Sequence, residues 1–118
     1  MQYGRIINIG SNLFHNPVVP YHDYTAAKAA ILSLTRTMAM ELGPSGVTVN
    51  CVSGGLLKVT DASEATPEAV WKGIEGATPL RRCIAPEEVA DVCLFLASEW
   101  GRGVTGQEIV VDGGLVMR

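Results

Sequence analysis

The chain has 118 residues, of which 47% are hydrophobic and 18% charged, and its formal net charge is −3. This length suits one small domain, and this composition excludes a disordered chain. The small negative charge gives no electrostatic reason to expect nucleic acid, no apolar run approaches a membrane span, and the first residues lack the anatomy of a signal peptide. We therefore expect a globular protein with neither a nucleic-acid nor a membrane partner.

A first strand is predicted over Arg5–Ile9, a short run that is β-branched and apolar except at Asn8. A continuously apolar strand of this kind is expected to be buried on both faces. Gly10, Ser11 and Asn12 end the run with small and polar side chains.

A loop is predicted from Asn12 to His22, because Pro17 and Pro20 break regular structure there. Histidine titrates near neutrality, so His15 and His22 in this loop are candidate proton carriers. No second feature supports that role, and we predict that both histidines lie on the loop surface.

A long helix is predicted from about Asp23 to Leu42, because apolar side chains recur there at helical spacing: Ala27, Ala30, Ile31, Leu34, Met38 and Leu42. Its other faces are rich in small residues, which would allow a second helix to pack closely. Gly43 is predicted to end the helix in a left-handed conformation, with Pro44 beyond it.

A second strand is predicted over Val47–Val52, so that strand, crossover helix and strand form a βαβ unit with parallel pairing. A polar region rich in Gly, Ala and Thr follows over residues 53–77. Within it, Thr66–Pro67 is predicted to start a helix that runs to about Glu75. The acidic side chains there are expected to form a solvated helix face: Glu64, Glu68 and Glu75.

The last third of the chain predicts one more helix, opened by Pro86, and a third strand over Gln107–Val111. The turn Asp112–Gly114 closes that strand, and the apolar tail Leu115–Met117 is expected to pack on the body or on a partner. The only basic pair, Arg81–Arg82, is either a plain loop pair or a contact for a phosphate-bearing ligand.

Three cysteines, Cys51, Cys83 and Cys93, form no Cys-x-x-Cys motif and leave an odd count. Cys51 and Cys93 lie in apolar runs, so we expect buried thiols that act as small hydrophobes. This usage suits a reducing, cytoplasmic location, and we expect no metal site.

Tyr24 and Lys28 are four positions apart at the start of the long helix, so they project from the same face. A phenol with its free pKa of about 10 is a poor acid or base near neutrality, and a nearby ammonium favours the phenolate. The pair could therefore transfer a proton, although two solvated polar residues on an amphipathic helix are the simpler interpretation.

Two flanking stretches favour the catalytic interpretation. The first strand ends in Ser11, thirteen residues before Tyr24, and the second ends in Ser53, Gly54 and Gly55. Ligands bind at the carboxyl ends of the strands in an open parallel sheet, so these segments are expected to converge on one crevice. A serine at the end of a strand more often bonds its own loop; the spacing to Tyr24 favours a functional role.

A strand ending in serine, a Tyr-x-x-x-Lys helix and a strand ending in a glycine turn together resemble the short-chain dehydrogenase/reductases, most closely the 3-oxoacyl-[acyl-carrier-protein] reductase group. The resemblance runs from about Gly4 to Gly114. It covers the C-terminal half of the family's usual domain and implies the fold class α/β: the C-terminal half of a doubly wound Rossmann-type parallel sheet, with three parallel strands and flanking helices.

The resemblance also implies roles for individual residues. Tyr24 matches the general acid/base, Ser11 matches the hydroxyl that fixes and polarises the substrate oxygen, and Lys28 matches the residue that supports the phenolate and bonds the nicotinamide ribose. The implied cofactor contacts are Tyr24, Lys28, Gly54, Gly55, Leu57 and Thr60. Gly54 replaces the proline of the family's Pro-Gly step. The substrate wall, by position, is Asn12, Leu13, Val18 and Tyr21.

The family's Gly-rich phosphate loop, the residue that selects between NAD and NADP and a fourth catalytic Asn have no counterpart in residues 1–118. We therefore expect these residues to be the catalytic half of one NAD(P)-binding domain without its dinucleotide-binding half.

The resemblance implies an NAD(P)-dependent oxidoreductase acting on a carbonyl or secondary alcohol, with a 3-oxoacyl thioester as substrate in fatty acid biosynthesis. NADP is favoured over NAD by resemblance only. The helix described above, apolar or small around most of its circumference, indicates a homo-oligomer, a dimer or tetramer. The alternative function is a non-catalytic fragment or pseudo-enzyme that serves as an interaction module.

Overall fold

The computed structural model describes residues 3–57 and 64–118 of the chain. The elements follow in the order β1 (Gly4–Ser11), η1 (Asn12–Phe14), α1 (His22–Leu42), η2 (Gly43–Ser45), β2 (Val47–Gly54), α2 (Glu68–Ala77), α3 (Pro86–Ala97), η4 (Glu99–Gly101) and β3 (Glu108–Val111), where η marks a short 3-10 helix.

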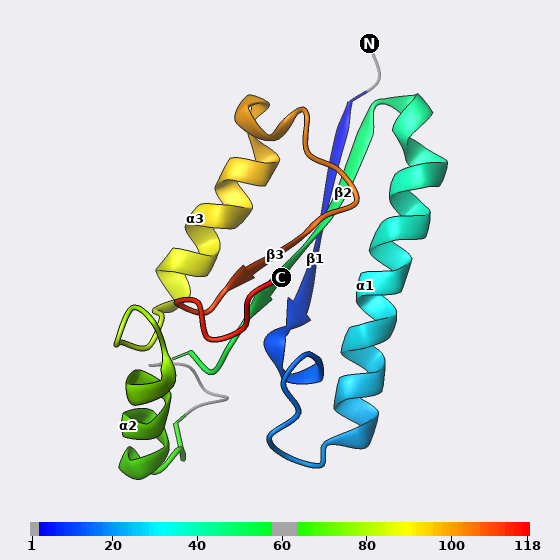
Figure 1. Cartoon of the computed structure of the whole chain (residues 1–118). Coiled ribbons are helices and arrows are strands. Elements are labelled where there is room, and N and C mark those ends of the chain that lie inside the picture. Colours follow the sequence, from blue (N-terminus) through cyan, green and yellow to red (C-terminus); the bar gives the residue numbers. More distant parts are fainter. Residues whose placement is uncertain (1–2, 58–63) are drawn as a thin grey trace.

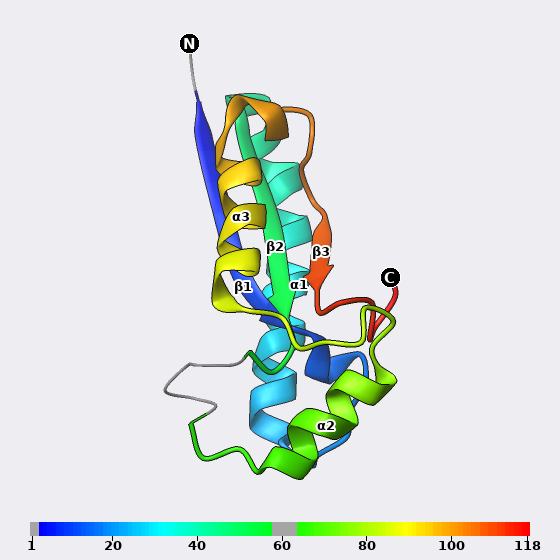
Figure 2. The same cartoon turned by 90° about the vertical axis from the view of Figure 1, so that its left-hand side faces the viewer.

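The three strands form one parallel sheet in the order β1-β2-β3. Figure 1 shows α1 on one side of the sheet and α3 on the other, with α2 below α3 near the strand ends. The view turned by 90° shows the strands side by side between the helices (Figure 2). The predicted α/β class, with three parallel strands and flanking helices, is confirmed.

The core is centred on β2, where Val49, Cys51 and Val52 are fully buried. The prediction that the first strand is buried on both faces is wrong, because β1 is mostly half-buried and Ile9 is 52% exposed. Within the described part of the chain, β1 pairs only with β2. Its second edge therefore lacks a neighbouring strand there.

The long helix α1 packs on the sheet through Leu32, Thr35 and Ala39. The Thr35 hydroxyl accepts a hydrogen bond from Asn8 Nδ2 at 3.0 Å and donates to the Ile31 carbonyl at 2.8 Å. This pairing satisfies the amide donor of Asn8 in the middle of β1. The helix that the sequence predicts is thus confirmed within one residue.

Two predicted helix ends differ in detail. Gly43 has φ −53°, so it is right-handed and continues into η2, and Gly46 takes the left-handed conformation at φ 78°. Pro44 inside η2 allows this tighter turn because a proline fits the first turn of a helix. At α2 the N-cap residue is Pro67, whose side chain forms no capping hydrogen bond. The helix begins at Glu68 rather than at Pro67.

The acidic face predicted near α2 is only partly observed. Glu64 and Glu68 are exposed, whereas Glu75 is half-buried. The apolar tail is likewise divided, because Leu115 and Val116 are half-buried and Met117 is exposed.

The cap of α3 explains how Ala85, which has no polar side chain, can precede that helix. Glu88 reaches back, and its Oε2 accepts the Ala85 backbone N–H at 2.8 Å. The Arg82 guanidinium donates to both carboxylate oxygens of Glu88, at 2.8 and 2.6 Å. The Arg82 guanidinium is therefore bound to Glu88, and the Arg81 side chain donates to the Gly76 carbonyl.

This cap predicts a pH dependence. The hydrogen bonds from Arg82, and then from the Ala85 N–H, lower the pKa of Glu88 to about 2 from 4.5. A depressed carboxyl pKa contributes stability above the unfolded value, and the contribution is lost as the pH falls from about 4.5 through 2. We expect Glu88→Gln to flatten the loss of stability over that window.

The measurement is urea unfolding of the wild-type and Glu88→Gln proteins at pH 6 and at pH 3. Low salt is used because salt screens an exposed ion pair such as Arg82–Glu88. Equal pH dependence in the two proteins would contradict the assigned role of Glu88.

No helix among the described residues combines the length and the apolar character needed to cross a membrane.

Candidate active site

The candidate site lies where the strands end. Parallel pairing places Ser11 of β1 opposite Gly54 of β2, and Gly54 opposite Val111 of β3. In Figure 1 the arrowheads of the three strands point toward the same end of the sheet. The loop after β1 passes this end on its way to α1, so Tyr24 in the first turns of α1 lies at the same end of the molecule.

Ser11 is buried and caps η1, because its Oγ accepts the Leu13 backbone N–H at 3.1 Å. This is the local loop bond that a strand-end serine commonly makes. It does not exclude a catalytic role. The bond uses the oxygen as an acceptor, and the hydroxyl hydrogen remains available to a substrate oxygen.

Lys28 connects the start of α1 to the end of β1. Its Nζ donates to the Ile9 carbonyl at 3.0 Å, two residues before Ser11, and lies 5.7 Å from the centroid of the Tyr24 ring. Tyr24 is 43% exposed, and its hydroxyl has no hydrogen-bond partner among the described residues. The phenol is therefore open to a ligand while its neighbouring ammonium is anchored to the strand.

The glycine turn after β2 meets the same loop. A Cβ at Gly55 would lie 3.0 Å from Asn12 Nδ2 and 3.5 Å from Asp112 Cβ, so a larger residue there would displace the Asn12 side chain slightly. Leu57 is half-buried near Gly54, and Thr60 lies outside the described residues. The Gly54–Gly55 turn and the exposed Tyr24 leave backbone and polar atoms approachable from outside the protein.

Asn12, a residue of the predicted substrate wall, has a hydrogen-bond partner within the protein. Its Nδ2 donates to Asp112 Oδ2 at 2.9 Å. Asp112 also accepts the backbone N–H groups of Val116 and Gly114, at 2.9 and 3.0 Å. Asn12 thus joins the loop after β1 to the turn after β3, and Leu13 beside it is half-buried.

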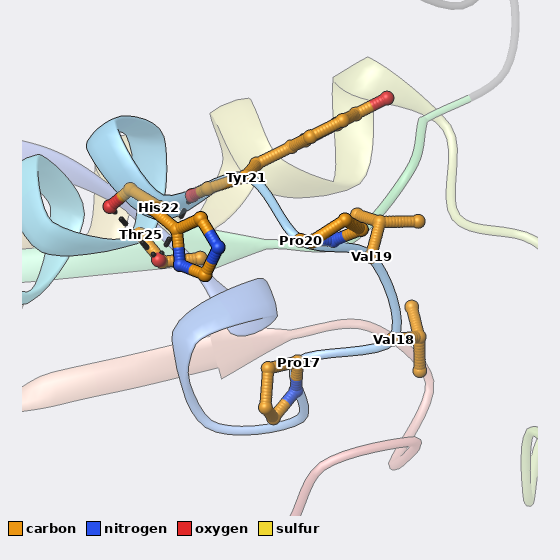
Figure 3. A pocket seen from close by; sticks show the side chains of 7 residues that line it. All are labelled: Pro17, Val18, Val19, Pro20, Tyr21, His22 and Thr25. Carbon is orange, nitrogen blue, oxygen red and sulfur yellow. Dashed lines mark hydrogen bonds between the residues drawn. The ribbon is translucent and has the colours of Figure 1, made fainter.

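The other two residues of the predicted substrate wall line an open cavity of about 370 Å³. Figure 3 shows it formed by one continuous loop and the start of α1: Pro17, Val18, Val19, Pro20, Tyr21, His22 and Thr25. Thr25 donates to the Tyr21 carbonyl at 2.9 Å, which ties the loop to the helix. Val18 and Tyr21 are exposed and give the cavity an apolar surface with one phenol.

A buried polar cluster beneath this loop was not predicted. His15 and Glu108 form a pair with Nε2 and Oε1 2.7 Å apart, and their side chains are only 7% and 5% exposed. The prediction that His15 lies on the loop surface is therefore wrong, whereas His22 is exposed as predicted. A glutamate at the start of an apolar strand was the one signal in the sequence, since a buried carboxylate needs a partner.

The cysteines behave as packed hydrophobes. Cys51 is fully buried and Cys93 is half-buried, and burial raises the pKa of both thiols. They therefore remain protonated near neutrality, which disfavours a nucleophilic role. Among the described residues no group of three His, Cys, Asp or Glu side chains could hold a metal ion.

Comparison with known proteins gives the family. The sequence model of the family described as "Enoyl-(Acyl carrier protein) reductase" matches residues 1–116. The chain is 42% identical over 113 residues to a 3-alpha-(or 20-beta)-hydroxysteroid dehydrogenase of Mycobacterium tuberculosis, covering 96% of the chain and 41% of that protein.

It is also 40% identical over 116 residues to a 3-oxoacyl-[acyl-carrier-protein] reductase of Pseudomonas aeruginosa, covering 98% of the chain and 47% of that protein. An equally similar reductase occurs in Thermotoga maritima, at 40% identity over 116 residues, with 97% of the chain and 46% of that protein covered. The chain thus spans less than half the length of these curated relatives. With its parallel sheet and its Ser, Tyr-x-x-x-Lys and glycine-turn segments, the chain belongs to the short-chain dehydrogenase/reductase family of oxidoreductases.

Proposed function

We propose that the protein containing this chain is an NAD(P)-dependent oxidoreductase that interconverts a carbonyl and a secondary alcohol. The observation that carries the proposal is the bond from Lys28 Nζ to the Ile9 carbonyl. It holds the helix face that carries Tyr24 against the strand that ends in Ser11. An open phenol, an anchored ammonium and a hydroxyl with a free hydrogen suit proton transfer at a substrate oxygen.

The bound nicotinamide would supply the hydride. The residues of this chain would bind the carbonyl oxygen of the substrate and supply its proton. Ser11 would donate its hydroxyl hydrogen to the carbonyl oxygen and so stabilise the charge that develops there. Tyr24 would deliver the proton, and the Lys28 ammonium would stabilise the phenolate that remains.

The cofactor would be held at its nicotinamide end by Tyr24, Lys28 and the Gly54–Gly55 turn, with Leu57 and Thr60 near the carboxamide. We further propose that residues 1–118 are the catalytic half of one Rossmann-type domain. The open second edge of β1 supports this arrangement, because parallel sheets are normally continued and covered. The dinucleotide-binding half would then pair beside β1, and NADP is the favoured cofactor.

For the substrate we propose a 3-oxoacyl thioester, as named for the reductases of Pseudomonas aeruginosa and Thermotoga maritima. A hydroxysteroid is the second candidate, because the mycobacterial relative is 42% identical and the cavity at Val18 and Tyr21 is apolar. Both substrates would present the oxygen of a ketone to Ser11 and Tyr24 and an apolar part to the cavity.

The test is a steady-state assay of the complete protein with an acetoacetyl thioester and with a 3-oxosteroid, each with NADPH and NADH. We expect NADPH oxidation that depends on the thioester, with a higher kcat/KM than for the steroid. The reverse ranking would assign the chain to the second candidate. Failure of both ketones with both cofactors would favour a non-catalytic interaction module.

We also propose a cytoplasmic homo-oligomer. Helix α1 exposes two large apolar side chains, Leu34 at 55% and Met40 at 82%, and exposed apolar surface can mark a protein–protein contact. A second copy of α1 would cover this surface. A well-behaved monomer of the complete protein at micromolar concentration in sedimentation would contradict this part of the proposal.

A further inference from the structure

A buried carboxylate holds the segment that follows the candidate catalytic serine. Glu108 is the first residue of β3, and its register partner on β2 is Cys51. Its Oε2 accepts the Ser53 hydroxyl at 2.7 Å, and its Oε1 lies 2.7 Å from His15 Nε2 and 4.0 Å from Arg118 Nε. A carboxylate with a side chain only 5% exposed is costly unless such partners satisfy it.

The arrangement is not that of a nucleophilic triad. In such a triad the histidine lies between the nucleophile and the carboxylate. Here the histidine and Ser53 both contact Glu108, one at each oxygen, so the histidine is not placed to activate the serine. The cluster therefore connects neighbouring segments of the chain and does not form a second catalytic site.

That connection leads to η1. His15 caps the C-terminal end of η1 and is held by Glu108, while Asn12 at the other end is held by Asp112. The two carboxylates are four residues apart on β3 and the turn after it. Both ends of a three-residue helix are thus bound to one segment, and the His15 ring also packs on Phe14 with ring centroids 4.0 Å apart.

The helix held in this way determines the hydrogen bonding of Ser11. Leu13, in the middle of η1, donates its backbone N–H to Ser11 Oγ at 3.1 Å. If η1 shifted, this donor would move away and the hydroxyl could rotate to donate elsewhere. A shift of about 1 Å in such a group can lower a rate by about 100-fold.

We propose that His15 and Glu108 are positioning residues for Ser11. Their bond fixes η1, η1 fixes the Leu13 N–H, and that N–H keeps the Ser11 hydroxyl hydrogen free for the substrate oxygen. The proposal rests on the proposed function for its effect on rate, and it makes a separate structural claim that holds without any substrate.

The first test concerns the structural claim and needs no activity. His15→Phe keeps an aromatic ring beside Phe14 and removes the donor to Glu108. His15→Gln keeps an N–H donor on a side chain of similar reach. We expect hydrogen exchange of the Leu13 amide, followed by NMR in the complete protein, to be at least about 10-fold faster in His15→Phe and largely restored in His15→Gln.

Glu41→Gln is the control for Glu108→Gln, because Glu41 is an exposed carboxylate on the last turn of α1. We expect Glu108→Gln to accelerate exchange at Leu13 and Glu41→Gln to leave it unchanged. Unaltered protection of Leu13 in a folded His15→Phe or Glu108→Gln protein would overturn the proposal, whether or not the wild-type protein reduces ketones.

The second test separates positioning from general stability. We expect His15→Phe to lower kcat by ~10- to 100-fold with little change in the KM for the cofactor. In a Ser11→Ala background the same change should have almost no further effect on kcat, because its only route to the reaction has been removed. Equal losses in both backgrounds would show that His15 acts on stability alone, and absence of wild-type turnover would refute the proposed function and leave the exchange test to decide this one.

Discussion

Tyr24→Phe is expected to lower kcat for ketone reduction by at least ~10²- to 10⁴-fold, the usual contribution of a positioned general acid. The fold should not change. The Tyr24 side chain is 43% exposed and its hydroxyl has no hydrogen-bond partner among the described residues, so its removal leaves no buried group unpaired. The measurement is kcat with saturating ketone and NADPH, together with the melting temperature.

Tyr3→Phe is the matched control, because it removes the same atom from an exposed tyrosine at the opposite end of the sheet. Its hydroxyl donates to the Ala97 carbonyl at 3.2 Å, far from the strand ends where Ser11 lies. We expect near-wild-type kcat for Tyr3→Phe. If Tyr24→Phe kept the turnover of this control, Tyr24 would not be the general acid.

Residues 1–118 purified by themselves are expected to bind neither NADPH nor NADH at micromolar concentrations and to show no turnover. The described residues offer contacts near the nicotinamide, from Lys28 and from the Gly54–Gly55 turn. The pyrophosphate of a dinucleotide is usually held by a glycine-rich loop and the helix N-terminus that follows it. Contacts to a single ribose cannot replace that site.

The same experiment has a structural component. The second edge of β1 has no partner among the described residues, and α1 exposes the apolar side chains of Leu34 and Met40. Both features favour aggregation of the isolated segment. Calorimetric titration of residues 1–118 beside the complete protein gives the comparison, and micromolar binding with steady turnover by the isolated segment would refute our account of the dinucleotide site.

The sequence predicts the regular elements well because each depends on local pattern. α1 and β2 follow from apolar spacing and from the Gly-Pro pair between them, and β3 follows from a short β-branched run before two glycines. The details at helix ends were less predictable. Gly43 and Gly46 can both adopt a left-handed conformation, so the local pattern does not decide which of them does.

The contacts that connect distant segments were not predictable from local pattern. His15 and Glu108 are 93 residues apart, and the sequence around His15 is that of an ordinary exposed loop. Only the fold places η1 over the start of β3. The same holds for Asn12 and Asp112, 100 residues apart, whose bond assigns Asn12 a partner within the protein.

The prediction that β1 is buried on both faces failed for another reason. Apolar content predicts which residues prefer to be covered, but it does not reveal what covers them. Ile9 is half exposed among the described residues although its side chain is as apolar as those of the buried β2. The proposed role of the Tyr-x-x-x-Lys pair rests on its spacing to Ser11 together with the family resemblance, and the structure adds the Lys28–Ile9 bond that neither indicated.

Hydride transfer by the complete protein is the central claim, and isotope labelling tests it most directly. NADPH carrying deuterium at the transferable C4 position is incubated with the protein and an acetoacetyl thioester, and the product is analysed by NMR. We predict deuterium on the new carbinol carbon, at a rate that falls with Tyr24→Phe and not with Tyr3→Phe. An alcohol without deuterium, or no alcohol at all with either nicotinamide cofactor and either ketone class, would contradict the account.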